Sequence, residues 1–212
     1  MNTKRLTYLF TVLVVFFCAC LIVSNIVAAK LWATPIPNLT LTAAILLFPL
    51  VYIIGDVIPE VYGLQIARRV IFLGFLVNAL AVAFFWLTLK LPYPVFWTGQ
   101  EAFEIVLGFT PRLLVASFIA FIIGTNTNAW IMVTMKKKTN GKWLWSRTIS
   151  STIVGEAVDS TIFITIAFWG ILPPAALVNM IIAQAIFKTL YEILATPLTY
   201  LIVNKVKKYE SN

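Results

Sequence analysis

The sequence contains no histidine, which excludes a histidine-ligated metal site and a histidine proton relay. Cysteine is scarce as well. Cys18 and Cys20 lie two residues apart in an apolar stretch, so on a helix they point to different sides and no local disulfide is expected. Neither thiol has a basic neighbour that would activate it, so an enzyme is not expected. A Walker A sequence is also absent, so the chain is not expected to hydrolyse ATP, and no cofactor is predicted.

Charged residues are few, at 11% of the chain, whereas 61% of the residues are hydrophobic and the mean hydropathy is +0.95. Soluble domains are only about half apolar. The composition therefore predicts an integral membrane protein of the all-α class, with residues 1–212 as a single transmembrane domain. The net charge is +8, but the basic residues flank the apolar segments, which indicates contact with the lipid bilayer rather than with nucleic acid.

Six apolar segments are long enough to cross about 30 Å of hydrocarbon as helices. They cover about residues 6–29, 39–58, 69–90, 112–135, 148–170 and 176–203. The first follows Lys4 and Arg5, as in a signal peptide, but it is too long for one and is expected to be a retained span.

Lysine and arginine predict the orientation of these spans. Lys30, Lys90 and Arg112 fall on one side of the membrane. Except for Lys188, which lies inside a span, the remaining lysines and arginines of the 16 fall on the other side. Because basic residues gather on the cytoplasmic side, both termini are expected to be cytoplasmic.

Four ionisable side chains lie inside the last two segments: Glu156, Asp159, Lys188 and Glu192. A charge at the bilayer centre costs about 2.5–3.5 kcal/mol, so it is kept when it is paired, protonated or functional. With a rise of about 1.5 Å per residue, Asp159 and Lys188 lie at the same depth, which allows them to pair, and Glu156 and Glu192 lie about one turn nearer the cytoplasm. One ammonium cannot neutralise three carboxylates, so we expect a bound solute to complete the site.

Amide side chains extend this polar stripe. Gln184 precedes Lys188 by one helical turn, Asn126 and Asn128 lie near the middle of the fourth segment, and Asn25 lies nearer the outside. These residues are candidates for a solute-binding cavity. The alternative is that they only hold the helices together by hydrogen bonds.

A second cluster lies at the predicted inner end of the second segment. Pro59 is expected to break the helix there, which would let Asp56 and Glu60 pair with Arg68 or Arg147. This pattern indicates either an inner gate or ordinary ion pairs at a helix end.

The order of several short motifs resembles the queuosine precursor transporter family, also known as a vitamin uptake family. The motifs are Ser24-Asn25-Ile26-Val27-Ala28-Ala29-Lys30, Phe48-Pro49, Gly55-Asp56, Glu60-Val61-Tyr62-Gly63, Pro111-Arg112, Ala116-Ser117, Arg147, Ser150-Ser151-Thr152, Gly155-Glu156, Asp159-Ser160 and Phe163. The likeness covers most of the chain. In that family the position of Glu156 can carry a glutamine, so this carboxylate would affect substrate details rather than the shared mechanism.

The resemblance implies six helices, similar to the substrate-binding subunits of energy-coupling-factor transporters, in the plasma membrane of a prokaryote. It also implies uptake of a 7-deazaguanine, namely the 7-cyano or 7-aminomethyl precursor or queuine, for salvage in tRNA modification. A subunit that needs an energising partner is the alternative within transport, and a structural scaffold is the alternative outside it. The choice among deazaguanines, proton coupling against facilitated uptake, and association into a homodimer stay open.

Overall fold

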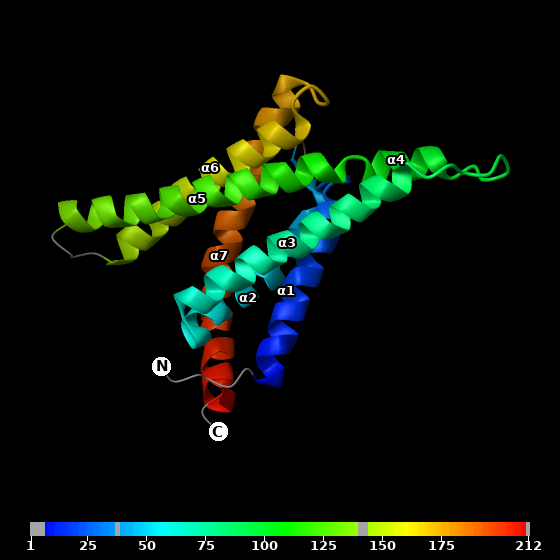
Figure 1. Ribbon diagram of the computed structural model, residues 1–212. Coiled ribbons are helices and arrows are strands. Elements are labelled where there is room, and N and C mark those ends of the chain that lie inside the picture. The colour runs from blue at the N-terminus through cyan, green and yellow to red at the C-terminus, as the bar shows by residue number, and fades with distance from the viewer. Residues whose placement is uncertain (1–6, 37–38, 140–143, 211–212) are drawn as a thin grey trace. The chain divides into compact units, whose positions relative to one another are not determined.

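The computed structural model describes residues 7–36, 39–139 and 144–210 (Figure 1). Within these ranges the chain is almost entirely helical. The α-helices are α1 Tyr8–Val27, α2 Phe48–Tyr62, α3 Leu64–Leu89, α4 Gln100–Leu107, α5 Thr110–Lys138, α6 Leu144–Phe168 and α7 Pro174–Glu210. A 3-10 turn at Ala43–Leu46 precedes α2. The predicted all-α class is confirmed.

Five helical segments are long and apolar enough to cross a membrane, as judged by length and composition. They are Tyr8–Val27, Leu64–Leu89, Gln100–Met135, Ile149–Phe168 and Pro174–Glu210. Several such segments are what a polytopic membrane protein requires. These five segments overlap the first, third, fourth, fifth and sixth predicted spans, and the largest difference is at Gln100, twelve residues before the predicted start at 112.

The predicted second span, 39–58, is wrong as a single helix. Residues Thr40–Thr42 form strand β2, the 3-10 turn follows, and α2 begins only at Phe48. Pro49 lies in the first turn of α2, the place in a helix where a missing N–H is harmless. The 15 residues of α2 extend about 22 Å, which is less than the hydrocarbon thickness.

The expected break at Pro59 is also wrong. Pro59 lies inside α2, which continues to Tyr62. The helix ends at Gly63, whose φ of 92° is a conformation that glycine adopts without the steric penalty of a Cβ. Gly63 then leads directly into α3, which begins at Leu64, so Arg68 lies inside that helix rather than before it.

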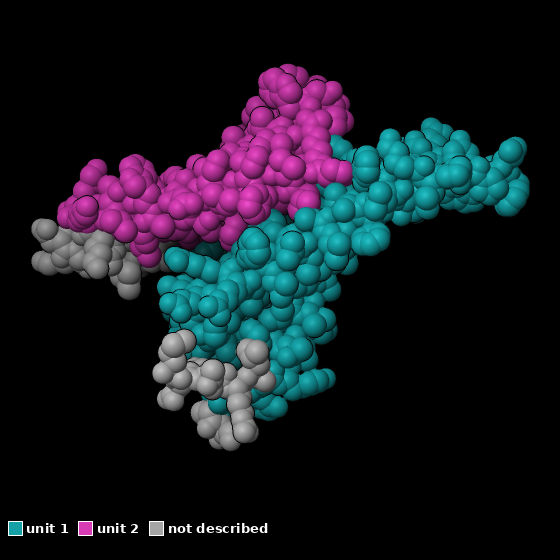
Figure 2. Space-filling view, viewed as in Figure 1, with its two compact units in different colours: residues 1–28, 43–110, 192–212 teal, residues 29–42, 111–191 magenta. Residues whose placement is uncertain are grey.

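The chain divides into two compact units, coloured separately in Figure 2. Unit 1 contains Met1–Ala28, Ala43–Thr110 and Glu192–Asn212, and unit 2 contains Ala29–Thr42 and Pro111–Tyr191. Helix α7 contributes its first half to unit 2 and its second half to unit 1.

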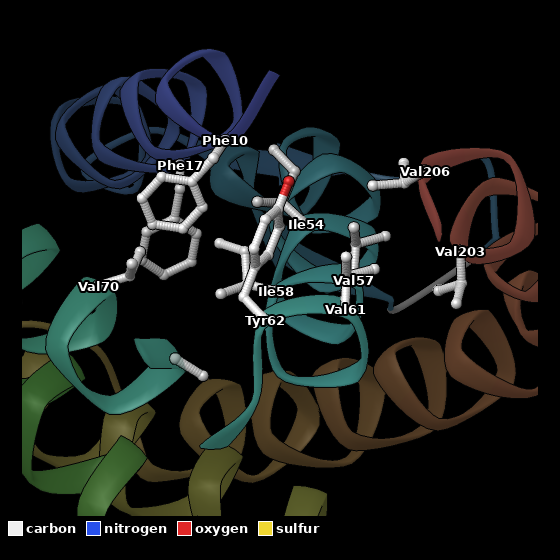
Figure 3. Close-up of a cluster of buried hydrophobic side chains, with 11 residues drawn as sticks. Phe10, Phe17, Ile54, Val57, Ile58, Val61, Tyr62, Val70, Val203 and Val206 are labelled. Atoms are coloured by element: carbon white, nitrogen blue, oxygen red, sulfur yellow. The ribbon is translucent and has the colours of Figure 1, made fainter. Parts of the chain in front are cut away.

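Unit 1 is built around an apolar core shared by α1, α2, α3 and the end of α7 (Figure 3). Phe10 of α1 packs edge-on against Tyr62 of α2, with ring centroids 4.7 Å apart. From α7, Val203 and Val206 join the same cluster. In lipid, apolar burial drives helix association only weakly, so close van der Waals packing of these side chains is what holds the helices together within the unit.

Unit 2 begins with a short hairpin that the sequence analysis did not predict. Strand β1, Leu31–Ala33, pairs antiparallel with β2, Thr40–Thr42, so that Trp32 lies opposite Leu41. The backbone N–H of Thr40 donates a hydrogen bond to the side-chain oxygen of Asn179 on α7, at 3.1 Å. The hairpin is therefore tied to the first part of α7.

Candidate functional site

The side chain of Lys188, on α7, is shared between two carboxylates of α6, and all three residues belong to unit 2. Its ammonium donates a short hydrogen bond to Asp159 Oδ2. The same nitrogen lies 3.4 Å from Glu156 Oε2. The Asp159–Lys188 pair that helix geometry allowed is therefore formed, and Glu156 joins it because residues three apart on a helix share a face.

The cluster is largely closed off from solvent, and its members differ in accessibility. The side chain of Lys188 is 7% exposed, whereas those of Glu156 and Asp159 are 15% and 20% exposed. The two carboxylates therefore form the more accessible part of the cluster. Burying these charges costs desolvation energy, which their mutual attraction offsets. Removing one partner would therefore leave a buried charge without that compensation.

A close crossing of α5 and α6 places Asp159. A Cβ added at Gly124 would lie 2.9 Å from the Cβ of Asp159, and one added at Gly155 would lie 3.0 Å from the Cβ of Asn128. The two glycines thus meet the partner helix at reciprocal positions four residues apart. Small residues allow helix backbones in membranes to approach in this way.

Two further buried polar groups belong to the same unit. Gln184, one turn before Lys188, is 1% exposed, and Ser160, next to Asp159, is fully buried. Their oxygens, Oε1 and Oγ, have no hydrogen-bond partner in the described part of the chain. Buried oxygens without partners are costly, which makes both candidates for contact with a solute or with water. Ser160 was missed as a candidate, because serine is common in membrane helices as a neutral residue.

The asparagines of α5 differ from each other. Asn126 is exposed and donates a hydrogen bond to the carbonyl of Ile122 in its own helix, at 2.7 Å. Asn128 is half-buried and lies against Gly155 at the helix crossing.

The other predicted site residues fall in unit 1. Asn25 is buried and donates a hydrogen bond to the carbonyl of Thr110, at 3.2 Å, which fixes the start of α5. Glu192 is half-buried and begins the part of α7 that belongs to unit 1.

The predicted pairing at the inner end of α2 is wrong for Glu60. Its partner is Lys207, near the end of α7, rather than Arg68. Asp56 and Arg68 are both exposed, and the side chain of Arg147 lies outside the described residues. Local spacing favoured Arg68, but the pair that forms joins residues 147 positions apart in the chain.

Arg112 has a structural role that was not predicted. From the sequence it served only to predict the orientation of the spans. Its Nε donates to the carbonyl of Ile166 at 2.6 Å, and its guanidinium also donates to the carbonyl of Trp169. These carbonyls lie at the end of α6, where intrahelical donors run out. The sequence carried no signal for this cap, because the last turn of α6 has no basic residue and Arg112 is 54 positions away from Ile166.

Comparison with known proteins finds transporters in each case. Residues 42–202 match the family model described as "Putative vitamin uptake transporter". The chain is 28% identical over 165 residues to the "Probable queuosine precursor transporter" of Bacillus subtilis (strain 168), covering 77% of this chain and 72% of that protein. It is 28% identical over 122 residues to the "Queuosine precursor transporter" of Escherichia coli (strain K12), covering 58% of this chain and 52% of that protein.

No solved structure matches the chain, so the comparison with energy-coupling-factor subunits stays a prediction. The family match covers most of the sequence, and both relatives are named as transporters. The chain therefore belongs to this vitamin uptake transporter family, which is a family of membrane transporters and not of enzymes.

Proposed function

We propose that this protein imports a 7-deazaguanine base, a queuosine precursor, across the plasma membrane of a prokaryote for salvage in tRNA modification. The names of the two relatives support the substrate class. The observation that carries the proposal is the buried ammonium of Lys188 between Asp159 and Glu156. Residues this polar are retained inside membrane helices mainly where a solute or ion passes.

The chemistry of the cluster suits a guanine edge. That edge presents the N1–H and 2-amino donors beside the O6 acceptor. The carboxylate of Asp159 accepts two parallel N–H bonds, and the ammonium of Lys188 donates to O6. Charge-assisted hydrogen bonds of this kind are strong in a dry site.

The remaining predicted site residues complete the proposal. Gln184 and Asn128 lie in the same unit as the charged cluster and supply further amide groups to the base. Asn126, Asn25 and Glu192 stay candidate solute contacts in this proposal, by their residue type and predicted depth in the membrane.

The membrane arrangement in this proposal has six crossings. The five long helical segments supply five of them, and α2, with the residues before it, supplies the sixth. Both termini are then cytoplasmic, in agreement with the distribution of Lys and Arg. In this arrangement the Glu60–Lys207 pair would lie on the cytoplasmic side, and we propose that it forms an inner gate together with Asp56 and Arg68, which belong to the same unit.

Uptake by the purified protein tests the function. Proteoliposomes that contain only this chain are given labelled 7-cyano-7-deazaguanine or labelled 7-aminomethyl-7-deazaguanine, with and without a pH gradient. We expect saturable uptake by the wild-type chain and its loss in Asp159→Asn, with equal protein in the membrane. If the chain binds the base but transports it only with an energising partner, the proposal that it is a carrier by itself is wrong. The alternative of a substrate-binding subunit then holds.

Glu101→Gln, an exposed position on α4, is the matched control and should transport normally. Normal uptake by Asp159→Asn would contradict the assignment of the site.

A further inference from the structure

We infer that Glu156 selects a base that carries a positively charged amine on its 7-substituent over a base whose 7-substituent is neutral. The inference rests on the proposed function and names the substrate of that site more narrowly. It depends on the order of the three charged groups and on their net charge.

The order of charges across the cluster is carboxylate, ammonium, carboxylate. Lys188 contacts Asp159 through a short hydrogen bond and Glu156 at 3.4 Å, so the ammonium stands between the two acids. The cluster therefore presents an acceptor, a donor and a second acceptor.

A 7-aminomethyl-7-deazaguanine presents the complementary order. Its N1–H and 2-amino groups are donors, O6 comes next as an acceptor, and the 7-substituent follows O6 along the same side of the rings. With Asp159 on the N1 side and Lys188 at O6, the group that faces the 7-substituent is Glu156. A protonated amine there donates to the Glu156 carboxylate, whereas a nitrile offers only an acceptor.

The charge balance of the apolar segments around the cluster points the same way. Residues 113–135 and 148–187 contain no ionisable side chain of the Asp, Glu, Lys and Arg types except Glu156 and Asp159, and Lys188 follows them. Two acids and one base leave one negative charge in excess when all three are ionised. Burial penalises an unbalanced charge, so a monocation is favoured over a neutral solute of the same shape.

The amine must hold its proton for this selection to work. An alkyl amine is protonated at neutral pH, as the lysine side chain is. If Glu156 instead carried a proton, the cluster would be neutral and the 7-substituent would matter little. The two cases predict different selectivities, so an experiment separates them.

The experiment is competition for uptake by proteoliposomes. Uptake of labelled 7-cyano-7-deazaguanine is inhibited by unlabelled 7-aminomethyl or 7-cyano base, and the ratio of the two half-inhibitory concentrations is measured. The wild-type chain should favour the amine by about tenfold or more, the usual effect of a hydrogen bond between charged groups. In Glu156→Gln the ratio should fall to near one, and because both concentrations are measured on the same variant, the ratio does not depend on how much uptake that variant retains.

Glu101→Gln provides the matched control, since it makes the same change at an exposed position of α4 and should keep the wild-type ratio. Binding of both bases to the detergent-solubilised Glu156→Gln variant, followed by thermal shift, verifies that the variant is folded. A wild-type ratio near one, or an unchanged ratio in Glu156→Gln, overturns the inference while the proposed function stands. Absence of uptake and binding of both bases by the wild-type chain overturns both.

Discussion

Gly124 of α5 lies directly against Asp159 of α6, so that a Cβ at Gly124 would be 2.9 Å from the Cβ of Asp159. Real Cβ atoms do not approach so closely, and the neighbouring backbone of α6 leaves little room to move. The absence of a side chain at Gly124 is therefore what allows Asp159 to stay beside Lys188.

We predict that Gly124→Ala impairs transport by displacing Asp159 from Lys188. Overpacking of this kind costs about 1–3 kcal/mol in a well-packed interior. Uptake should fall severalfold at equal amounts of protein in the membrane, and the melting temperature in detergent should decrease.

Gly55→Ala is the matched control for that prediction. A Cβ at Gly55 meets nothing within 4 Å, and alanine favours the helix more than glycine does. Stability should stay the same or rise slightly. Equal loss of uptake in the two variants would show that glycine is needed for helix flexibility and not for the close crossing.

Lys188→Met should destabilise the protein strongly, because it leaves Glu156 and Asp159 buried together without the ammonium. Removal of one partner from a buried ion pair costs about 3–5 kcal/mol. Adding Asp159→Asn should restore part of the lost stability, because the second change removes the uncompensated charge. Thermal unfolding of both single variants and the double variant measures this coupling, and additive effects would contradict it.

The Lys207–Glu60 pair supplies a contrast to that experiment. Its side chains are 46% and 60% exposed, so solvent screens the pair. Exposed pairs contribute about 0–1 kcal/mol, and Lys207→Met should change the melting temperature little. A large loss of stability there would mean that the pair is more shielded than its exposure indicates.

Tyr62→Phe should loosen the end of α7 from the rest of unit 1. The Tyr62 hydroxyl donates to Glu210 Oε1 at 2.8 Å, and the Thr7 hydroxyl donates to the same oxygen. Phenylalanine keeps the packing against Phe10 and removes one hydrogen bond to a charged group, which is worth about 1.5–3 kcal/mol before solvent screening reduces it. Hydrogen exchange of the last turns of α7 should become faster.

Tyr93→Phe is the control for Tyr62→Phe. Tyr93 is exposed in the segment between α3 and α4, and its ring contact with Trp97 does not need the hydroxyl. Unchanged exchange in both variants would show that Thr7 alone holds Glu210.

Long apolar runs and regular helix geometry made much of this fold predictable. The level positions of Asp159 and Lys188 follow from a constant rise along each helix, and the two side chains pair as that geometry allows. The hairpin at Leu31–Thr42 was missed because its strands are only three residues each, too short for a clear alternating pattern.

Contacts between distant residues were not predictable from spacing. Glu60 has Arg68 nearby in sequence, yet it pairs with Lys207, because the packing of α2 against the end of α7 decides which cation is within reach. The close approach of α5 and α6 at Gly124 and Gly155 could not be predicted from spacing either. A glycine in a helix indicates that something comes near, but it does not say which helix.

Arg112→Lys should uncap α6 although it preserves the charge. Arg112 reaches two carbonyls, those of Ile166 and Trp169, through different nitrogens of one planar group. Lysine has a single ammonium and cannot reproduce this fork, so at least one carbonyl loses its donor. A hydrogen bond from a charged donor contributes about 1.5–3 kcal/mol, and the partial exposure of both carbonyls reduces this loss.

The measurement for Arg112→Lys is thermal unfolding in detergent, with hydrogen exchange at the end of α6 as the local readout. Lys90→Arg serves as the reverse control, since Lys90 is exposed and its side chain lies over the ring of Trp86 rather than on a helix end. We expect the end of α6 to exchange faster in Arg112→Lys and unchanged in Lys90→Arg. If Arg112→Lys left that end fully protected, a positive charge alone would be enough to cap α6. The pair of hydrogen bonds from Arg112 to the two carbonyls would then not be needed.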